Sequence, residues 1–115
     1  MATYKGISGF KVQTLSADPV ATAAWSAGGA MNTGRQNGAG LGSSIATWAG
    51  GGADDPLGYT ANAEEYNGTS WAEQNNLNTA RKGLAGVGIQ TAALAIGGAT
   101  PSDTANVETY NGTSW

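Results

Sequence analysis

Two arginines at matching places in the sequence are the strongest candidates for binding chemistry. Arg35 closes the tetrapeptide that begins at Asn32, and Arg81 closes the one that begins at Asn78, so that both read Asn-Thr-x-Arg. The guanidinium fork presents several hydrogen-bond donors at once. A repeated Arg/Asn set around a channel mouth could therefore hold an anionic or hydroxyl-rich ligand.

A purely structural role for the same arginines is the alternative. Glu64 and Glu108 also occupy matching positions. The two guanidinium groups could pair with these carboxylates or donate to loop carbonyls. The sequence leaves both interpretations open.

Catalytic and metal chemistry have little to build on. The chain contains no His and no Cys, which excludes a His-based triad and a Cys/His zinc site. Asp54, Asp55 and Asp103 lack the spacing of a calcium loop and are better suited to turns. Hydrolysis by a carboxylate pair is a remote alternative, because the few acids lie in turns or at strand edges. We expect no enzyme activity, no metal and no cofactor.

The aromatic residues divide into packing and contact candidates. Trp25, Trp71 and Trp115 recur at matching positions, which favours burial between units over sugar stacking. Trp48 is expected in the core, with ligand or channel contact as the alternative. Tyr59, in a loop of variable length, is a candidate for an exposed ligand contact.

Charge and hydropathy exclude further classes. The net charge is −3 and no basic run exists, so nucleic acid is not an expected partner. The N-terminus lacks the apolar core of a signal peptide, and no apolar run is long enough to span a membrane. Neither secretion through a signal peptide nor a membrane location is expected.

Composition favours an all-β fold. Gly accounts for 19 of 115 residues and charged residues for 11%, while large aliphatic residues are sparse. Small residues suit closely packed strands and tight turns better than a helical bundle. The regular placement of Trp and Tyr argues against disorder.

An internal repeat of about 45 residues is the dominant signal. The hexapeptide Tyr66–Trp71 recurs without change as Tyr110–Trp115, and upstream matches extend back to Trp25. The difference in length between the two units falls between Asp54 and Tyr59, which marks a surface loop.

Each unit predicts four short strands. In the first unit, the strands are expected at residues 36–43, 45–50, 63–66 and 70–74; in the second, at 82–90, 92–96 and 107–110, with a fourth strand that begins near Trp115. Asn67-Gly68 and Asn111-Gly112 predict two-residue hairpin turns. Four antiparallel strands in each unit are typical of a β-propeller blade.

An apolar run that ends in Gly-Gly, then Glu-x-Tyr, then a Trp five residues later resembles the kelch repeat. The resemblance covers Trp25 to Trp115 and implies propeller blades; Trp48 and Gly50 depart from it where the second unit has Leu94 and Ile96. The kelch-like galactose oxidases need Cys and His, which this chain lacks.

The opening residues 1–13 and the phrase Leu-Asn-Thr-Ala-Arg at residues 77–81 resemble kelch-like repeat proteins of marine bacteriophages. This resemblance implies a protein of the virion or its tail, located in the virion or, during assembly, in the host cytoplasm. It supports a binding module, conceivably lectin-like, with a glycan or another virion protein as partner. A purely structural virion unit without a small ligand is the alternative.

Two blades are too few to close a propeller, which typically has about 4–8. We therefore expect either that the chain is part of a longer array of blades or that it binds copies of itself, with a trimer of six blades preferred over a tetramer of eight. The predicted organisation is an arm at 1–21, a closing strand plus first blade at 22–71, and a second blade at 72–115. Residues 22–28 could be lent to a neighbour, but Trp25 and Trp115 are equivalent and cannot both fill one slot.

Overall fold

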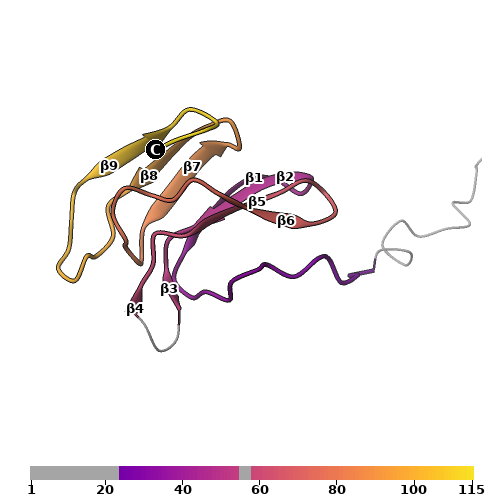
Figure 1. Cartoon of the computed structure of the whole chain (residues 1–115), viewed down its shortest axis with the longest axis horizontal. Helices are drawn as coiled ribbons and strands as arrows, with labels where there is room; N and C mark the ends of the chain where they lie inside the picture. Colours follow the sequence, from indigo (N-terminus) through magenta and orange to yellow (C-terminus); the bar gives the residue numbers. More distant parts are fainter. Residues whose placement is uncertain (1–23, 55–57) are drawn as a thin grey trace, which may run out of the picture.

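The computed structural model describes residues 24–54 and 58–115, and over these ranges the chain is all-β with antiparallel sheets. The predicted arm at 1–21, together with Thr22, Asp55 and Pro56, lies outside the described residues. Figure 1 shows two sheets joined along the chain, with a small hairpin projecting from the first. None of the described segments forms a helix that could cross a membrane.

Sheet 1 contains the four strands expected of the first unit. They are β1 (Ala39–Ser43), β2 (Ala46–Gly50), β5 (Ala63–Tyr66) and β6 (Trp71–Gln74), paired in that order. Between β2 and β5, β3 (Ala53–Asp54) and β4 (Gly58–Tyr59) form a hairpin at the place where a variable loop was predicted. β6 carries sheet 1 past the predicted boundary at Trp71.

Sheet 2 has three strands among the described residues, not the four of a complete blade. They are β7 (Ala85–Ile89), β8 (Ala92–Ile96) and β9 (Val107–Tyr110). The fourth strand that was expected to begin near Trp115 is not formed, since residues 111–115 lie outside any strand.

The innermost strand of each unit begins later than predicted, for a backbone reason. Asn37 and Gly83, at equivalent positions, have φ angles of 55° and 66°. A left-handed residue interrupts a strand. Only Gln36 and Lys82, just before these breaks, make isolated bridges, to Ala53 and Ala99 respectively.

The Asn-Gly turns are longer than expected. The loop from β5 to β6 spans four residues, and φ is positive at Gly68 (94°) but not at Asn67. The Asn67 side chain accepts hydrogen bonds from the Thr69 and Ser70 N–H groups, both at 2.9 Å. The turn is therefore stabilised by its asparagine side chain, which the type I′ prediction did not include.

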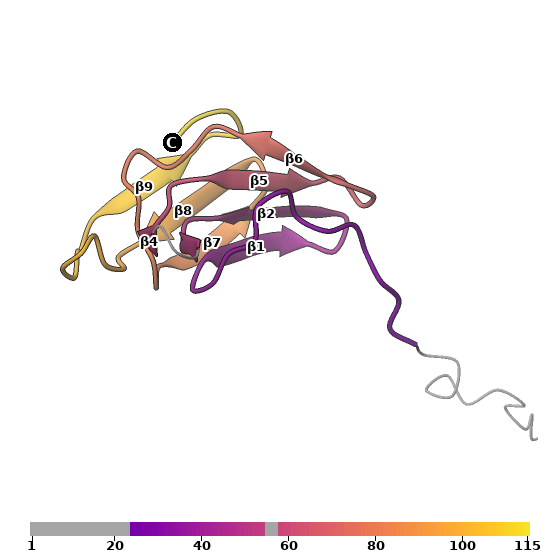
Figure 2. The ribbon, with the colours of Figure 1, turned by 60° about the horizontal axis from the view of Figure 1, so that its bottom comes forward.

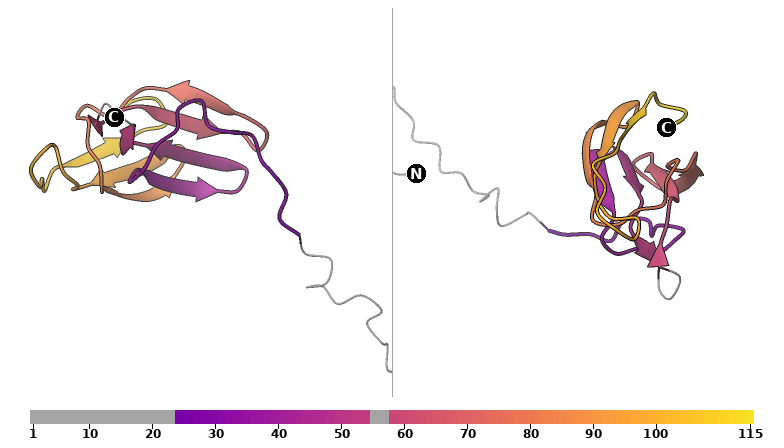
Figure 3. Two further views of the ribbon diagram at one scale, coloured as in Figure 1. Left: turned by 90° about the horizontal axis from the view of Figure 1, so that it is seen from below. Right: turned by 90° about the vertical axis from the view of Figure 1, so that its left-hand side faces the viewer.

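The core lies between the two sheets, which overlap as neighbouring layers in Figures 2 and 3. Its largest fully buried apolar side chains are Trp48 and Tyr110. Trp48 has room because its ring lies over Gly50, where a Cβ atom would approach the ring within 2.3 Å. The first unit has Gly50 where the second has Ile96, and the larger Trp48 fills the space that a side chain at position 50 would occupy.

The predicted closing strand is not formed in the part of it that the structure describes. Residues 24–28 have no strand pairing, and Trp25 is fully exposed. Trp71 and Trp115 occupy the positions in the repeat that match Trp25. Trp71 begins β6 of sheet 1, and Trp115 follows β9 of sheet 2. Trp25 does not pack against residues 24–54 or 58–115 of its own chain, and its packing between units of neighbouring copies stays a prediction.

Candidate functional site

The first predicted Arg/Asn set forms a cluster around a buried carboxylate. Glu64 accepts hydrogen bonds from the Asn32 backbone N–H at 2.7 Å and its Nδ2 at 3.1 Å, and from the Thr33 N–H at 3.1 Å. Arg35 completes the cluster through an Nη2–Oε1 ion pair of 2.7 Å. The segment that precedes β1 is thereby fixed to β5.

The remaining end of the Arg35 guanidinium also bonds within the fold. Its Nη1 donates to the Asn62 carbonyl at 2.6 Å and to the Gly51 carbonyl at 3.3 Å. The side chain is only 5% exposed. Both Nη atoms are therefore engaged by groups of the same chain.

The surroundings of Glu64 favour its charged form. Burial acts to raise its pKa, but hydrogen bonds from the Asn32 N–H, the Arg35 guanidinium and the Thr33 N–H, with the positive charge of Arg35, outweigh burial. The net effect holds the pKa of Glu64 below its ordinary value of 4.5. The ion pair is thus charged at neutral pH.

The second unit repeats this arrangement. Glu108 accepts from the Asn78 N–H at 2.7 Å and its Nδ2 at 2.9 Å, and forms an ion pair with Arg81. The Nη1 atom of Arg81 donates to two loop carbonyls at 2.9 and 3.1 Å. Both arginines make the contacts with glutamates and loop carbonyls that the structural alternative describes, and ligand binding by Asn32, Asn78 and the arginines stays a prediction.

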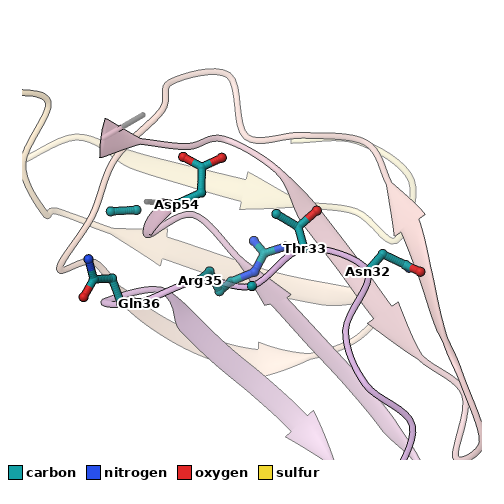
Figure 4. A pocket seen from close by; sticks show the side chains of 7 residues that line it. Asn32, Thr33, Arg35, Gln36 and Asp54 are labelled. Atoms are coloured by element: carbon teal, nitrogen blue, oxygen red, sulfur yellow. The ribbon is translucent and has the colours of Figure 1, made fainter. Parts of the chain in front are cut away.

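A polar hollow opens beside the first cluster, as Figure 4 shows. It has a volume of about 610 Å³. Its lining residues are Asn32, Thr33, Gly34, Arg35, Gln36, Ala53 and Asp54. The hollow is bordered by backbone and by side chains that are largely committed to the Glu64 cluster.

Tyr59, the fifth predicted site residue, lies apart from these clusters. Its ring faces the Lys82 ammonium, with Nζ 5.0 Å from the ring centroid, and its hydroxyl donates to the Pro101 carbonyl at 3.3 Å. Both contacts tie the β3–β4 hairpin to the second unit. Tyr59 does not join the Arg/Asn residues in one site.

The free face of sheet 2 is the other unusual surface. The strand register places Val87, Leu94 and Thr109 in one row, and Ala85, Ile96 and Val107 in the next row of the same face. We call this set the trailing face of sheet 2. Val87 and Val107 are 53% and 54% exposed, and a groove of about 410 Å³ runs past Leu94.

The equivalent face of sheet 1 is buried. Leu41, Trp48 and Ala63, which match Val87, Leu94 and Val107 in the repeat, are at most 8% exposed. Sheet 2 covers them, and Trp115 adds its indole ring, whose centroid lies 4.8 Å from that of Trp48. One and the same face is therefore covered in the first unit and open in the second.

The opposite, leading face of sheet 1 is different in character. Its rows contain Gly40, Thr47, Ala49, Glu64 and Tyr66. The trailing face of sheet 2 is thus apolar, while the leading face of sheet 1 is mixed, with glycine, alanine and polar residues. Between the two trailing faces, the sequence changes from Glu65 to Thr109 and from Ala63 to Val107, which makes the face of sheet 2 the more apolar at these positions.

Comparison with protein-family models and with curated proteins found no match to this chain. No cluster of three or more potential metal ligands occurs in residues 24–54 and 58–115.

Proposed function

We propose that this protein is a non-catalytic assembly module, whose two sheets are wedges of a β-propeller that copies of the chain complete together. The observation that carries the proposal is the exposed apolar trailing face of sheet 2, whose equivalent in sheet 1 is buried. An apolar surface of this kind is expected to be covered by a partner.

The repeat suggests the number of copies. A propeller closes with about 4–8 blades, and each chain supplies two. A ring of three copies with six blades is preferred, and four copies with eight blades is the second choice. Cyclic assembly would cover every blade face without further partners.

Native mass in solution tests the proposal. The chain should run at the mass of three protomers in native mass spectrometry and in sedimentation velocity, at micromolar concentration and moderate salt. A folded, monodisperse monomer under these conditions would contradict the assembly function.

The resemblance to kelch-like bacteriophage proteins supports a virion or tail setting for this assembly. Within that setting, a purely structural unit is favoured over a lectin-like one, because the Arg35 and Arg81 forks are engaged by Glu64 and Glu108. Glycan binding by the assembled protein at millimolar sugar would restore the lectin-like version, and co-purification with other virion proteins without any glycan binding would support the structural one.

A further inference from the structure

We infer that the trailing face of sheet 2 binds the leading face of sheet 1 of a second copy, head to tail, in the register of the contact between the two sheets within one chain. This inference rests on the proposed assembly function and specifies its interface.

The intramolecular contact between the two sheets is tight at Gly86. A Cβ atom built on Gly86 would lie 3.0 Å from the Ala39 Cβ and 3.3 Å from the Leu41 Cδ2. The leading face of sheet 2, which contains Gly86 and Ala95, thus lies close against the trailing face of sheet 1, which contains Ala39 and Leu41. A side chain at position 86 would force these neighbours to shift. Gly86 is explained by packing.

Gly40 is the equivalent of Gly86 in sheet 1, and within one chain it has no such explanation. The nearest atom to a Cβ built on Gly40 is the Trp48 carbonyl oxygen at 3.9 Å, an ordinary contact. Its φ angle is not in the left-handed region. Glycine in the interior of a strand weakens that strand, so its presence here calls for a neighbour that residues 24–54 and 58–115 of the same chain do not provide. The equivalents of Ala39 and Leu41 are Ala85 and Val87, on the exposed trailing face of a second copy.

The segment that leads into each sheet shows the same difference. Leu77 and Leu84 lie at the sheet 1–sheet 2 contact and are 4% and 7% exposed. Their equivalents before β1 are Met31, which is partly buried, and Gly38, which is exposed. The polar hollow beside Arg35 lies in this uncovered region, so a preceding unit would cover it.

Individual contacts also translate across the repeat. Trp115 packs on Trp48 within the chain, so Trp71 of a second copy would lie over Leu94, where the groove offers space for an indole ring. Within the chain, the Tyr110 hydroxyl donates to the Glu65 carboxylate at 3.0 Å. Between copies, the equivalent pair would be the Tyr66 hydroxyl of one copy and the Thr109 hydroxyl of the other. Leucine and threonine in place of tryptophan and glutamate distinguish the contact between copies from the contact within a chain.

The two faces differ from each other, which decides the symmetry. A trailing face rich in Val, Leu and Ile matches a leading face with Gly40 and Ala49, but two trailing faces would place large side chains against each other. The contact is therefore heterologous, and a heterologous contact forms a ring when its rotation closes. A symmetric dimer through two trailing faces is the competing arrangement.

Two single substitutions, tested alone and mixed, separate these arrangements. Gly40→Val adds a side chain to the leading face where the isolated chain has room, and Leu94→Arg places a charge on the trailing face. Under the head-to-tail arrangement each variant alone should be monomeric. Mixed in equal amounts, they should form a 1:1 dimer that grows no further, because the intact trailing face of one binds the intact leading face of the other.

The control is Ile45→Arg, which alters an exposed apolar residue outside both faces and should assemble as the unsubstituted chain does. Thermal unfolding establishes that each variant is folded, and Ile96→Arg replaces Leu94→Arg if the latter fails to fold. If Gly40→Val still self-associates while Leu94→Arg does not, the symmetric trailing-face dimer is correct and the inference is overturned, although assembly itself stands. If the unsubstituted chain is monomeric, the proposed function fails together with the inference.

Discussion

The indole rings of Trp115 and Trp48 pack at a centroid distance of 4.8 Å with an interplanar angle of 56°. Trp115 also stacks on Tyr110 at 4.9 Å and 25°. The three rings join the end of sheet 2 to the middle of sheet 1. Aromatic contacts of this geometry stabilise beyond the area they bury, so this cluster should hold the two sheets together.

Replacing Trp48 with the residue of the second unit should destabilise the chain. Trp48→Leu removes the contact with Trp115 and leaves a cavity over Gly50, at an expected cost of about 2–4 kcal/mol in the free energy of unfolding. Urea unfolding measures it. The matched control, Trp25→Leu, makes the same change at a fully exposed position and should stay within about 0.5 kcal/mol. Equal effects at the two positions would disprove the role of the cluster.

Removing one member of the Arg81–Glu108 pair should lower the free energy of unfolding far more than replacing both members with apolar residues. Arg81→Met leaves a largely buried carboxylate without its partner, and removal of one member of such a pair costs about 3–5 kcal/mol. The double variant Arg81→Met/Glu108→Leu removes both charges and should recover a large part of that loss. Chemical denaturation of Arg81→Met, Glu108→Leu and the double variant gives the coupling energy between the two side chains. Additive effects would show that the two side chains act independently.

Acid should unfold the protein partly through Glu64. Its pKa is lowered in the folded state, so the unfolded state binds its proton first as the pH falls. The stabilisation is complete above the ordinary pKa of 4.5 and is lost as the pH falls through the lower, folded-state value. In Glu64→Gln the free energy of unfolding should be smaller at pH 7 and should fall less steeply below about pH 4.5. Parallel pH profiles of variant and unsubstituted chain would contradict this.

Alkali should act through Tyr110. Burial, then its hydrogen bond to Glu65 and the charge of that carboxylate, raises the pKa of Tyr110 to about 12. A raised pKa means that the stabilisation is present below the ordinary value of 10.0 and is lost as the pH rises towards 12. In Tyr110→Phe, stability should decline less between these pH values, and the tyrosinate absorbance titration should lose its latest component. An unchanged titration would assign the late component to another group.

The candidate residues were found from the sequence, but their role was not decided there. The matching positions of Arg35 and Glu64, and of Arg81 and Glu108, indicated repeated function or repeated structure equally well. The choice depends on where the guanidinium donors point, and a separation of some thirty residues along the chain contains no information on that. In the folded chain both Nη atoms of Arg35 have acceptors, which favours structure.

The sequence by itself determined the all-β class, the strands of the first sheet and the place of the variable loop, because Gly-Gly breaks, alternation and a repeated hexapeptide are local signals that each unit satisfies alone. Only the tertiary structure decided which face of each sheet is covered, that Trp25 is exposed while Trp115 is packed, and that Gly40 lacks a neighbour that Gly86 has. The physical reason is that burial is a property of pairs of surfaces. Two units of nearly equal sequence acquire different exposure when a face of one is covered by the other unit and the equivalent face of the second is not.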